Sequence, residues 1–540
     1  MNVTLRCRAR LLPFVAAAFL LVATPSISHA FSPDALLGPI QLAEAQATKS
    51  ESTDGKSTEA KKQDSEKSAS ALPAASATDH SITIAGENID YSAEAGTITL
   101  PAEAGRPEAE IFYVAYLRKP ESNKRPITFV FNGGPGAAST YLHLGGIGPR
   151  AVAVNAKGEL EGPPPRLVDN ELTWLDLTDL VFVDPVGTGY SRVHDGDEHK
   201  YWGVEQDTDA LTDFVRLYLI KSARMLSPVF LAGESYGGFR VAGLARALQK
   251  SSANSPSGVV LISPVLEFSL LYADEYNPLS WALDLPSLAA VNLEKKGVQG
   301  REALRSALEE AERYAMSDYL VAIAAGNEAG GEAASAKVAE LTGLPQSLVE
   351  KREARIPTSL FIKEFDRANK QVLSRYDGSI GAPDPNPASS HPTGPDPVLD
   401  ATVPLWTAAF VQYAGEELGY KTDRPYTLLN REARNKWDFG TSPTRQGYAG
   451  VVEDLQDARA ANPSLPVLIA TGYTDLITPY LASTYLVRQL PSLPNATPIR
   501  VETYAGGHML YLRPESRAAL KEDVKSMYAR AAKAASLPEG

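Results

Sequence analysis

Polar and hydrophobic residues alternate in three short runs near residues 82–116, with the sequences SITIAG, GTITLP and EIFYVAYL. Glycine, proline and asparagine separate these runs, and such residues favour turns. The alternation predicts three antiparallel strands. We expect them to form a meander at one edge of a sheet.

Continuous hydrophobic runs replace the alternation further along the chain. They lie at residues 127–132, 180–184, 228–233, 258–263 and 466–472. Helical patterns, such as residues 207–222 and 239–249, separate several of them. Strands that are apolar at every position and joined by helices are typical of a parallel sheet covered on both faces. The pattern therefore predicts an α/β protein with a mostly parallel central sheet.

The strand-helix alternation stops between residues 266 and 430. This stretch is rich in Ala, Glu, Leu and Arg, has a mainly helical pattern, and contains a proline-rich loop at residues 381–397. Strand patterning returns at residues 466–472. We interpret the stretch as an inserted, mainly helical cap (266–430) over the carboxyl edge of a core formed by residues 81–265 and 431–540.

The N-terminus has the features of a secretory signal peptide. Arg6, Arg8 and Arg10 precede an apolar run over residues 11–22, and Ser28-His29-Ala30 follows it. A membrane-spanning helix needs about 20 apolar residues, so an uncleaved anchor is the less favoured alternative. We predict a signal peptide at residues 1–30 and an exported protein, periplasmic or secreted, with no stable membrane association after cleavage.

Residues 31–80 are predicted to be a disordered tether. Most of this segment, from residue 46 onward, is dominated by Ser, Ala, Lys, Glu and Asp and contains no aromatic residue. Such a sequence buries too little apolar surface to offset its ordering entropy. A solvated helix near residues 59–68 is the alternative.

Charge and cysteine content exclude several classes of function. The 540-residue chain has a formal net charge of −13, which argues against nucleic acid or an anionic membrane as a partner. The one cysteine, Cys7, lies in the predicted signal peptide, so neither disulfides nor thiol chemistry are expected. His194 and His199 lie in a polar loop that we interpret as solvated. No metal site and no cofactor are therefore predicted.

The strand at residues 228–233 leads into Gly233-Glu234-Ser235-Tyr236-Gly237-Gly238, and a helical pattern follows. A G-x-S-x-G sequence between a strand and a helix is the nucleophile elbow of the α/β-hydrolase fold. The glycines fit a turn so sharp that side chains beside the serine would collide with strand and helix. We predict Ser235 as the nucleophile, against the alternative of a chance match in an ordinary turn.

A serine nucleophile needs a base and a carboxylate that orients the base, in the chain order Ser, acid, His for this fold. Asp475 follows the strand at residues 466–472, and His508 is the one histidine beyond it. We predict a triad of Ser235, Asp475 and His508. A helix N-cap is the alternative for Asp475, and a hydrogen-bonded loop histidine is the alternative for His508.

An oxyanion hole in this fold uses two backbone N–H groups, one from the residue after the nucleophile and one from the loop after an early strand. The first is Tyr236. The second is predicted to be Gly134, in the glycine-rich loop Asn132-Gly133-Gly134-Pro135-Gly136. A plain tight turn is the alternative for this loop.

Five motifs then occur in a fixed order: FNGGPG at 131–136, NELTWLDLTDLVFVDPVGTGYS at 170–191, GESYGG at 233–238, GxxD at 472–475 and GGHM at 506–509. With these motifs the chain resembles the serine carboxypeptidase family over most of residues 82–533. The resemblance implies release of single residues from peptide C-termini through an acyl-enzyme, often best at acidic pH.

The resemblance also implies a site for the substrate's terminal carboxylate. In that family the Asn and adjacent Gly of NGGPG, with the Glu before the nucleophile, bind this group, and they match Asn132, Gly133 and Glu234. Glu234 would have to be protonated for this purpose, because two ionised carboxylates repel at contact distance.

The chain departs from the family at two places. Many members carry a second Glu that shares a proton with the first, and here Gly146 stands there. Ala137 replaces the family's Cys after NGGPG. Arg240 could supply a charge to the carboxylate site in place of the missing Glu. We favour instead a salt bridge of Arg240 on the helix surface.

Peptides are the predicted partners, but the same triad would also serve an esterase or an acyltransferase, since all proceed through an acyl-enzyme. A non-catalytic binding protein on the same scaffold is the other alternative. The preferred side chain, the endogenous substrate and the oligomeric state are not determined by these patterns.

Overall fold

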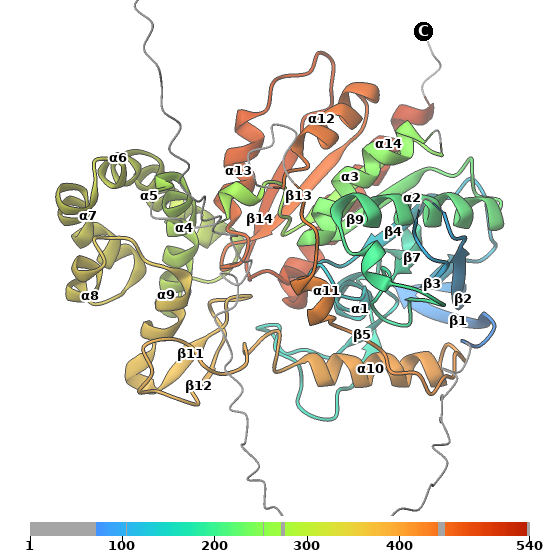
Figure 1. The fold of residues 1–540 in the computed structure, drawn as a ribbon, viewed down its shortest axis with the longest axis horizontal. Coiled ribbons are helices and arrows are strands. Elements are labelled where there is room, and N and C mark those ends of the chain that lie inside the picture. The colour runs from blue at the N-terminus through green and yellow to red at the C-terminus, as the bar shows by residue number, and fades with distance from the viewer. Residues whose placement is uncertain (1–71, 104, 252, 272–275, 441–448, 537–540) are drawn as a thin grey trace, which may run out of the picture. The chain divides into compact units, whose positions relative to one another are not determined.

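A computed structural model describes residues 72–536 except 104, 252, 272–275 and 441–448 (Figure 1). The predicted signal peptide and most of the predicted tether lie outside the described residues.

Three long antiparallel strands form one edge of the central sheet: β1 (Ser76–Ile84), β2 (Glu87–Leu100) and β3 (Ala109–Arg118). They confirm the predicted meander. The tether prediction is wrong for residues 76–80, because these residues pair with β2, where Ser76 lies opposite Ala95 and His80 opposite Tyr91. The His80 ring also stacks on Tyr91, with 5.4 Å between the ring centres.

Six parallel strands continue the sheet in the order β7, β4, β9, β10, β13 and β14. They span Asp179–Val183, Ile127–Phe131, Val229–Glu234, Gly258–Ile262, Val467–Gly472 and Arg500–Tyr504. All five predicted apolar strands are confirmed to within one residue at either end. β3 joins the parallel part by pairing antiparallel with β7.

Successive strand residues enter two separate buried clusters, as the twofold period of a strand requires. Phe129 and Leu231 face one cluster, with α2 (Val204–Lys221), α3 (Tyr236–Lys250) and α12 (Val452–Ala461). Val130 and Phe230 face the other, with α10 (Val403–Glu416) and α14 (Pro514–Ser536). Helices thus cover both faces, and the predicted α/β-hydrolase fold is confirmed.

Most of the predicted cap is helical and has its own apolar core, which includes Trp281, Val338 and Phe361. Its helices are α4 (Pro278–Lys295), α5 (Arg301–Tyr314), α6 (Leu320–Ala324), α7 (Asn327–Thr342), α8 (Gln346–Lys351) and α9 (Thr358–Glu364). α10 also falls within residues 266–430, but its buried Trp406 and Phe410 belong to the core of the sheet. The chain therefore returns to the core before residue 430.

The remaining elements are short. They are α1 (Thr140–Leu142), α11 (Arg431–Asn435), α13 (Tyr480–Gln489), β5 (Arg150–Val152), β6 (Leu167–Asp169), β8 (Arg192–Val193), β11 (Gln371–Leu373) and β12 (Gly381–Pro383). Single helical turns lie at η2 (His143–Ile147), η3 (Trp174–Asp176), η4 (Glu198–Tyr201), η5 (Phe268–Leu270), η6 (Ala315–Tyr319), η7 (Arg367–Asn369) and η8 (Leu510–Leu512).

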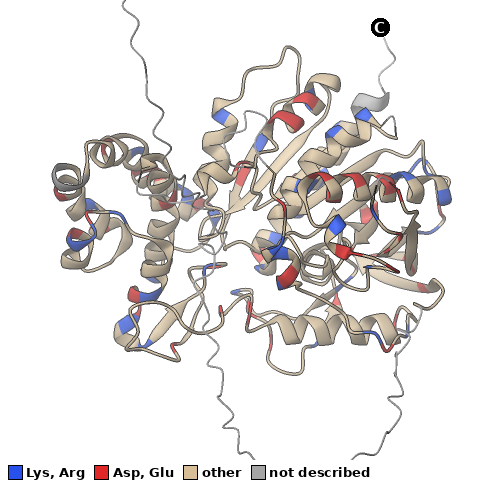
Figure 2. Cartoon of the chain, in the orientation of Figure 1, with Lys and Arg blue, Asp and Glu red and all other residues tan. Residues whose placement is uncertain are grey.

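Two surface properties bear on partners. Among the described residues, no helix combines the length and hydrophobicity needed to cross a membrane. In Figure 2, basic residues (blue) alternate with acidic residues (red) along the helices of core and cap, whereas nucleic-acid binding calls for a clustered basic face.

Candidate active site

Ser235 lies at the sharp turn between β9 and α3, with φ 60° and ψ −125°. Positive φ is uncommon for residues other than glycine and is often found at functional sites. The neighbouring glycines permit the turn: a Cβ at Gly238 would lie 2.6 Å from the Pro264 Cβ, and one at Gly237 would lie 2.9 Å from the Asn132 carbonyl carbon. The turn predicted from G-x-S-x-G is therefore present.

Asp475 follows β13, His508 follows β14, and the two side chains are hydrogen-bonded. His508 Nδ1 lies 2.8 Å from Asp475 Oδ2, and both residues are buried. The other carboxylate oxygen of Asp475 accepts hydrogen bonds from the N–H groups of Ile477 (2.8 Å) and Thr478 (2.9 Å). Because Nδ1–H donates to the carboxylate, Nε2 carries a free lone pair, which is the tautomer that a general base needs.

Burial lowers the pKa of His508, but the Asp475 carboxylate, its hydrogen bond and the Glu234 carboxyl raise it by more, so that the pKa lies above its ordinary value. The imidazolium form is therefore stabilised in this site, which suits a group that must take up a proton during the reaction.

The end of β10 contacts both the elbow and the histidine loop. The Ser235 N–H donates to the Ile262 carbonyl (2.9 Å), and the hydroxyl of the next residue, Ser263, donates to the His508 carbonyl (2.8 Å). Among the described residues, Ser235 and His508 share no side-chain hydrogen bond. Such bonds are often long before substrate binds. The three predicted triad residues thus follow the ends of β9, β13 and β14 at one edge of the sheet, and among the described residues the bond within the triad is Asp475–His508.

The glycine-rich loop 132–136 packs directly on the start of α3. A Cβ at Gly133 would lie 2.6 Å from the Tyr236 nitrogen, so only glycine fits. Tyr236 is the first residue of α3, and its N–H therefore has no partner within the helix. From the other side, the Asn430 N–H donates to the Gly136 carbonyl (2.7 Å). The two predicted oxyanion donors, Gly134 and Tyr236, thus belong to segments in contact.

Arg240 is buried, whereas we favoured a position on the helix surface. Its Nε donates to Asp207 Oδ2 at 2.6 Å, and its Nη1 donates to the Asn132 carbonyl at 2.5 Å. Its side chain has no exposed surface. The predicted salt bridge is present, but its predicted place on the helix surface is wrong, because α2 and α3 pack together and enclose the pair. Arg240 holds the glycine-rich loop to the nucleophile helix.

Glu234, the last residue of β9, lies in contact with Asn132. Its Oε2 accepts hydrogen bonds from Asn132 Nδ2 and from the Tyr511 hydroxyl, the latter at 2.8 Å. The Asn132 side-chain oxygen accepts in turn from the Leu142 N–H (2.9 Å). The other oxygen of Glu234, Oε1, is buried and has no partner among the described residues.

Burial raises the pKa of Glu234 to about 7. The carboxyl is therefore neutral in weakly acidic solution and can then donate a hydrogen bond. The structure thus brings together Asn132, Gly133 and Glu234, the residues predicted to bind a terminal carboxylate.

Tyr511 was missed by the sequence reasoning, and its ring lies where Gly146 leaves room. A Cβ at Gly146 would lie 3.0 Å from three carbon atoms of Tyr511. The signal available in the sequence was its position three residues after His508, in GGHMLYL.

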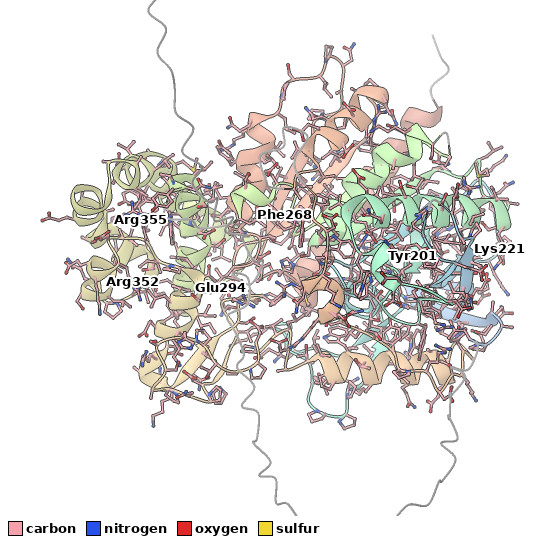
Figure 3. The ribbon with its side chains drawn as sticks, viewed as in Figure 1. Tyr201, Lys221, Phe268, Glu294, Arg352 and Arg355 are labelled. Carbon is pink, nitrogen blue, oxygen red and sulfur yellow. The ribbon has the colours of Figure 1, made fainter. Side chains whose placement is uncertain are left out.

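The cap also contributes to the site through Asp377, which sequence reasoning did not identify. Asp377 accepts from the Thr474 hydroxyl (2.7 Å) and from the Gly507 N–H (3.1 Å), each next to a predicted triad residue. Arg513 bridges Asp377 (3.1 Å) and Glu294 of α4 (2.9 Å), the latter labelled in Figure 3. The neighbouring Tyr376 carbonyl accepts from the His508 N–H at 2.5 Å.

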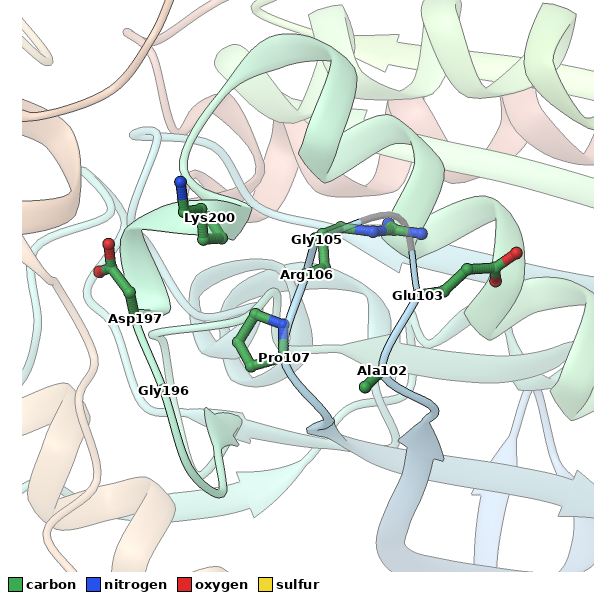
Figure 4. Close-up of a pocket in the computed structure, with 8 residues that line it drawn as sticks. All are labelled: Ala102, Glu103, Gly105, Arg106, Pro107, Gly196, Asp197 and Lys200. Atoms are coloured by element: carbon green, nitrogen blue, oxygen red, sulfur yellow. The ribbon is translucent and has the colours of Figure 1, made fainter.

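A pocket of about 490 Å³ lies elsewhere, between the β2–β3 connection and the segment before η4 (Figure 4). It is lined by Ala102, Glu103, Gly105, Arg106, Pro107, Gly196, Asp197 and Lys200. None of the candidate site residues lines it. Within the described part of the chain, no three His, Cys, Asp or Glu side chains are grouped as they would be around a metal ion.

Comparison with known proteins gives a family match for part of the chain. Residues 86–269 match the family described as serine carboxypeptidase. This range contains the glycine-rich loop and the elbow, and it ends before Asp475 and His508.

Two curated relatives are each 28% identical to the chain. Serine carboxypeptidase-like 5 of Arabidopsis thaliana matches over 197 residues, which are 34% of this chain and 42% of the relative. The pheromone-processing carboxypeptidase kex1 of Aspergillus niger matches over 189 residues, 34% of this chain and 29% of the relative. The chain thus spans less than half the length of these relatives.

Among solved structures, a prohormone-processing carboxypeptidase from Saccharomyces cerevisiae is similar, with 16% identity and a TM-score of 0.49. The similarity covers 81% of this chain and 91% of that one. The predicted resemblance to the serine carboxypeptidase family is confirmed over residues 86–269.

Proposed function

We propose that this protein is an exported serine-type carboxypeptidase that removes C-terminal residues from peptides through an acyl-enzyme on Ser235. The observation that carries the proposal is Glu234, which directly precedes the nucleophile. It is buried, two donors bind one of its oxygens, and the other oxygen is unpaired among the described residues. A buried polar atom without a partner is costly, and a bound ligand would supply one.

The reaction uses His508 and Asp475 around Ser235. His508 Nε2 takes the hydroxyl proton as Ser235 Oγ attacks the scissile carbonyl, and Asp475 stabilises the imidazolium that forms. The N–H groups of Gly134 and Tyr236 stabilise the oxyanion. His508 then gives its proton to the leaving amine, and water attacks the acyl-enzyme by the same steps to release the shortened peptide.

Recognition of the peptide end falls to Asn132, Gly133 and Glu234. A neutral Glu234 donates from Oε1 to the substrate's terminal carboxylate, and the Gly133 backbone lies next to the elbow to supply a further contact. Because the pKa of Glu234 is raised to about 7, this donor is lost as the pH rises through neutrality. We therefore propose that kcat/KM falls as the pH rises above about 7.

Export rests on the arginines, the apolar run and the small-residue site within residues 1–30. Periplasmic or secreted peptides are the proposed substrates. Mass spectrometry of the mature N-terminus after expression with a secretion system tests this point, and a chain that retains residues 1–30 would contradict it.

The activity is tested with blocked dipeptides that differ only in a free or an amidated C-terminus. We expect hydrolysis to depend on the free carboxylate, and Ser235→Ala to lower kcat by about 10⁴-fold or more. Equal hydrolysis of both peptides would instead favour an esterase. Failure of a fluorophosphonate probe to label Ser235 in the folded protein would favour a non-catalytic role.

A further inference from the structure

Tyr511 is the one aromatic hydroxyl that bonds to Glu234 in the described structure, and Gly146 leaves the space for its ring. We propose that Tyr511 is a positioning residue for substrate recognition: by occupying Oε2 of Glu234 it keeps the carboxyl proton on Oε1, where it meets the substrate's C-terminal carboxylate. This inference rests on the proposed carboxypeptidase function.

The hydrogen-bond pattern assigns the proton to Oε1. The Tyr511 hydroxyl and Asn132 Nδ2 both donate to Oε2, whereas Oε1 has no partner among the described residues. The orientation of Asn132 is set by the Leu142 N–H, which donates to its side-chain oxygen and so turns Nδ2 toward Glu234. A neutral carboxyl whose Oε2 already accepts two donors carries its proton on the other oxygen.

The position of Tyr511 is built into the fold. Its side chain is 1% exposed. A Cβ at Gly145 would lie 2.8 Å from the Tyr511 ring, and one at Gly146 would lie 3.0 Å from it, so two consecutive glycines accommodate the ring. The Tyr511 carbonyl accepts from Arg517 Nε at 2.8 Å, which fixes its backbone. Since η8 begins two residues after His508, one short segment carries both the base and the residue that orients Glu234.

Within the described part of the chain, four ionisable groups interact electrostatically with Glu234. They are His508 and Tyr511 from the loop and turn after β14, Asp475 from the loop after β13, and Tyr141 from α1. The Tyr511 hydrogen bond favours ionised Glu234, because a donor stabilises a carboxylate more than a neutral carboxyl. Removal of the hydroxyl therefore raises the pH at which Glu234 ionises.

The test is Tyr511→Phe, assayed on a blocked dipeptide with a free C-terminus across pH 4 to 9. We expect KM to rise by about threefold to tenfold at pH 5, the effect of one neutral hydrogen bond. We also expect the alkaline limb of kcat/KM to move upward by about one pH unit or more. A second substrate has an ester at the scissile bond and an amidated C-terminus, so it has no terminal carboxylate. The rate of its hydrolysis is expected to stay unchanged.

Tyr420→Phe is the matched control, because the Tyr420 hydroxyl is also buried but has no partner among the described residues. We expect it to leave KM and the pH profile at wild-type values. If Tyr511→Phe does not fold, Gly146→Ala displaces the ring instead and is expected to shift KM in the same direction.

Two failures remain distinguishable. A wild-type enzyme that ignores the terminal carboxylate would overturn the proposed function itself. A wild-type enzyme that requires the carboxylate, together with Tyr511→Phe that keeps both KM and the alkaline limb of the wild type, would overturn only the role of Tyr511.

Discussion

The candidate chemistry depends on how each side chain is buried. Burial raises the pKa of Glu234 by more than its two hydrogen-bond donors lower it, so its neutral form persists to higher pH than that of an exposed carboxyl. His508 is enclosed as well, yet the Asp475 carboxylate beside it favours its charged form. The proposed reaction requires neutral His508 and protonated Glu234, which predicts a bell-shaped pH dependence of kcat/KM.

Glu234→Gln is expected to remove the alkaline limb of this profile. The amide keeps acceptors for Asn132 and Tyr511 and offers a donor that does not titrate. Measurement of kcat/KM for a free-carboxylate peptide from pH 4 to 8 checks this. Asp284→Asn is the matched control, because burial also raises the pKa of Asp284, to about 8, within the cap. A flat profile in both wild type and Glu234→Gln would contradict the assignment.

Glu234 also affects stability with a definite sign. A carboxyl whose pKa is higher in the folded state than in the unfolded state adds stability at low pH, and this contribution is lost as the pH rises from about 4.5 through about 7. We expect Glu234→Gln to raise the free energy of unfolding at pH 8 relative to wild type by up to roughly 3 kcal/mol, and by much less at pH 4. Urea unfolding at the two pH values measures the difference. An equal change in the free energy of unfolding at both pH values would contradict the linkage between Glu234 ionisation and folding.

At the scale of elements, the site depends on how α2 and α3 pack together. Arg240 of α3 and Asp207 of α2 form a buried pair, and Arg240 also donates to the carbonyl of Asn132. The nucleophile helix thus holds the glycine-rich loop through a side chain, while Gly133 holds it through direct backbone contact. Helix packing is therefore coupled to the geometry of the loop that carries the predicted oxyanion donor Gly134.

Asp207→Ala is expected to destabilise the fold by about 3–5 kcal/mol, because it leaves the Arg240 guanidinium buried without its carboxylate. The double variant Asp207→Leu with Arg240→Met removes both charges and is expected to regain much of that stability. Thermal and urea unfolding of the three proteins make the comparison. A double variant as unstable as Asp207→Ala would show that the charges are not the cause.

At the scale of the whole described structure, the cap is joined to the catalytic edge through the segment around Asp377. Asp377 binds the loops that carry Asp475 and His508, and Arg513 connects it to Glu294 of α4. The predicted cap thus contacts both the loop that carries Asp475 and the loop that carries His508. No disulfide is available in the predicted mature chain for this purpose.

Asp377→Asn is expected to lower kcat by about tenfold while KM changes little, because it weakens the contacts that position His508 rather than those that bind the substrate. The rate of Ser235 labelling by a fluorophosphonate is expected to fall in parallel. Lys363→Met with Asp384→Leu is a useful comparison, since this buried pair lies in the cap away from the catalytic loops. A larger kcat loss in that variant would contradict a specific role for Asp377.

The sequence by itself determined the order of strands and helices, the elbow and the candidate triad. These features depend on local periodicity, on glycine at turns and on chain order. Each of these can be recognised from short stretches of the sequence without knowledge of the tertiary structure. The roles of Ser235, Asp475, His508, Gly134, Asn132 and Glu234 remain proposals, of which the variants above test those of Ser235 and Glu234 directly.

Tertiary structure alone decided which side chains from distant parts of the sequence contact those residues. Tyr511 fills the space at Gly146 although 365 positions separate them in the numbering. Likewise, Arg240 is buried because two helices close over it, and α10 packs on the sheet although it lies in the range predicted for the cap. Such contacts depend on packing between segments far apart in the chain, which no local pattern of hydrophobic and polar residues specifies.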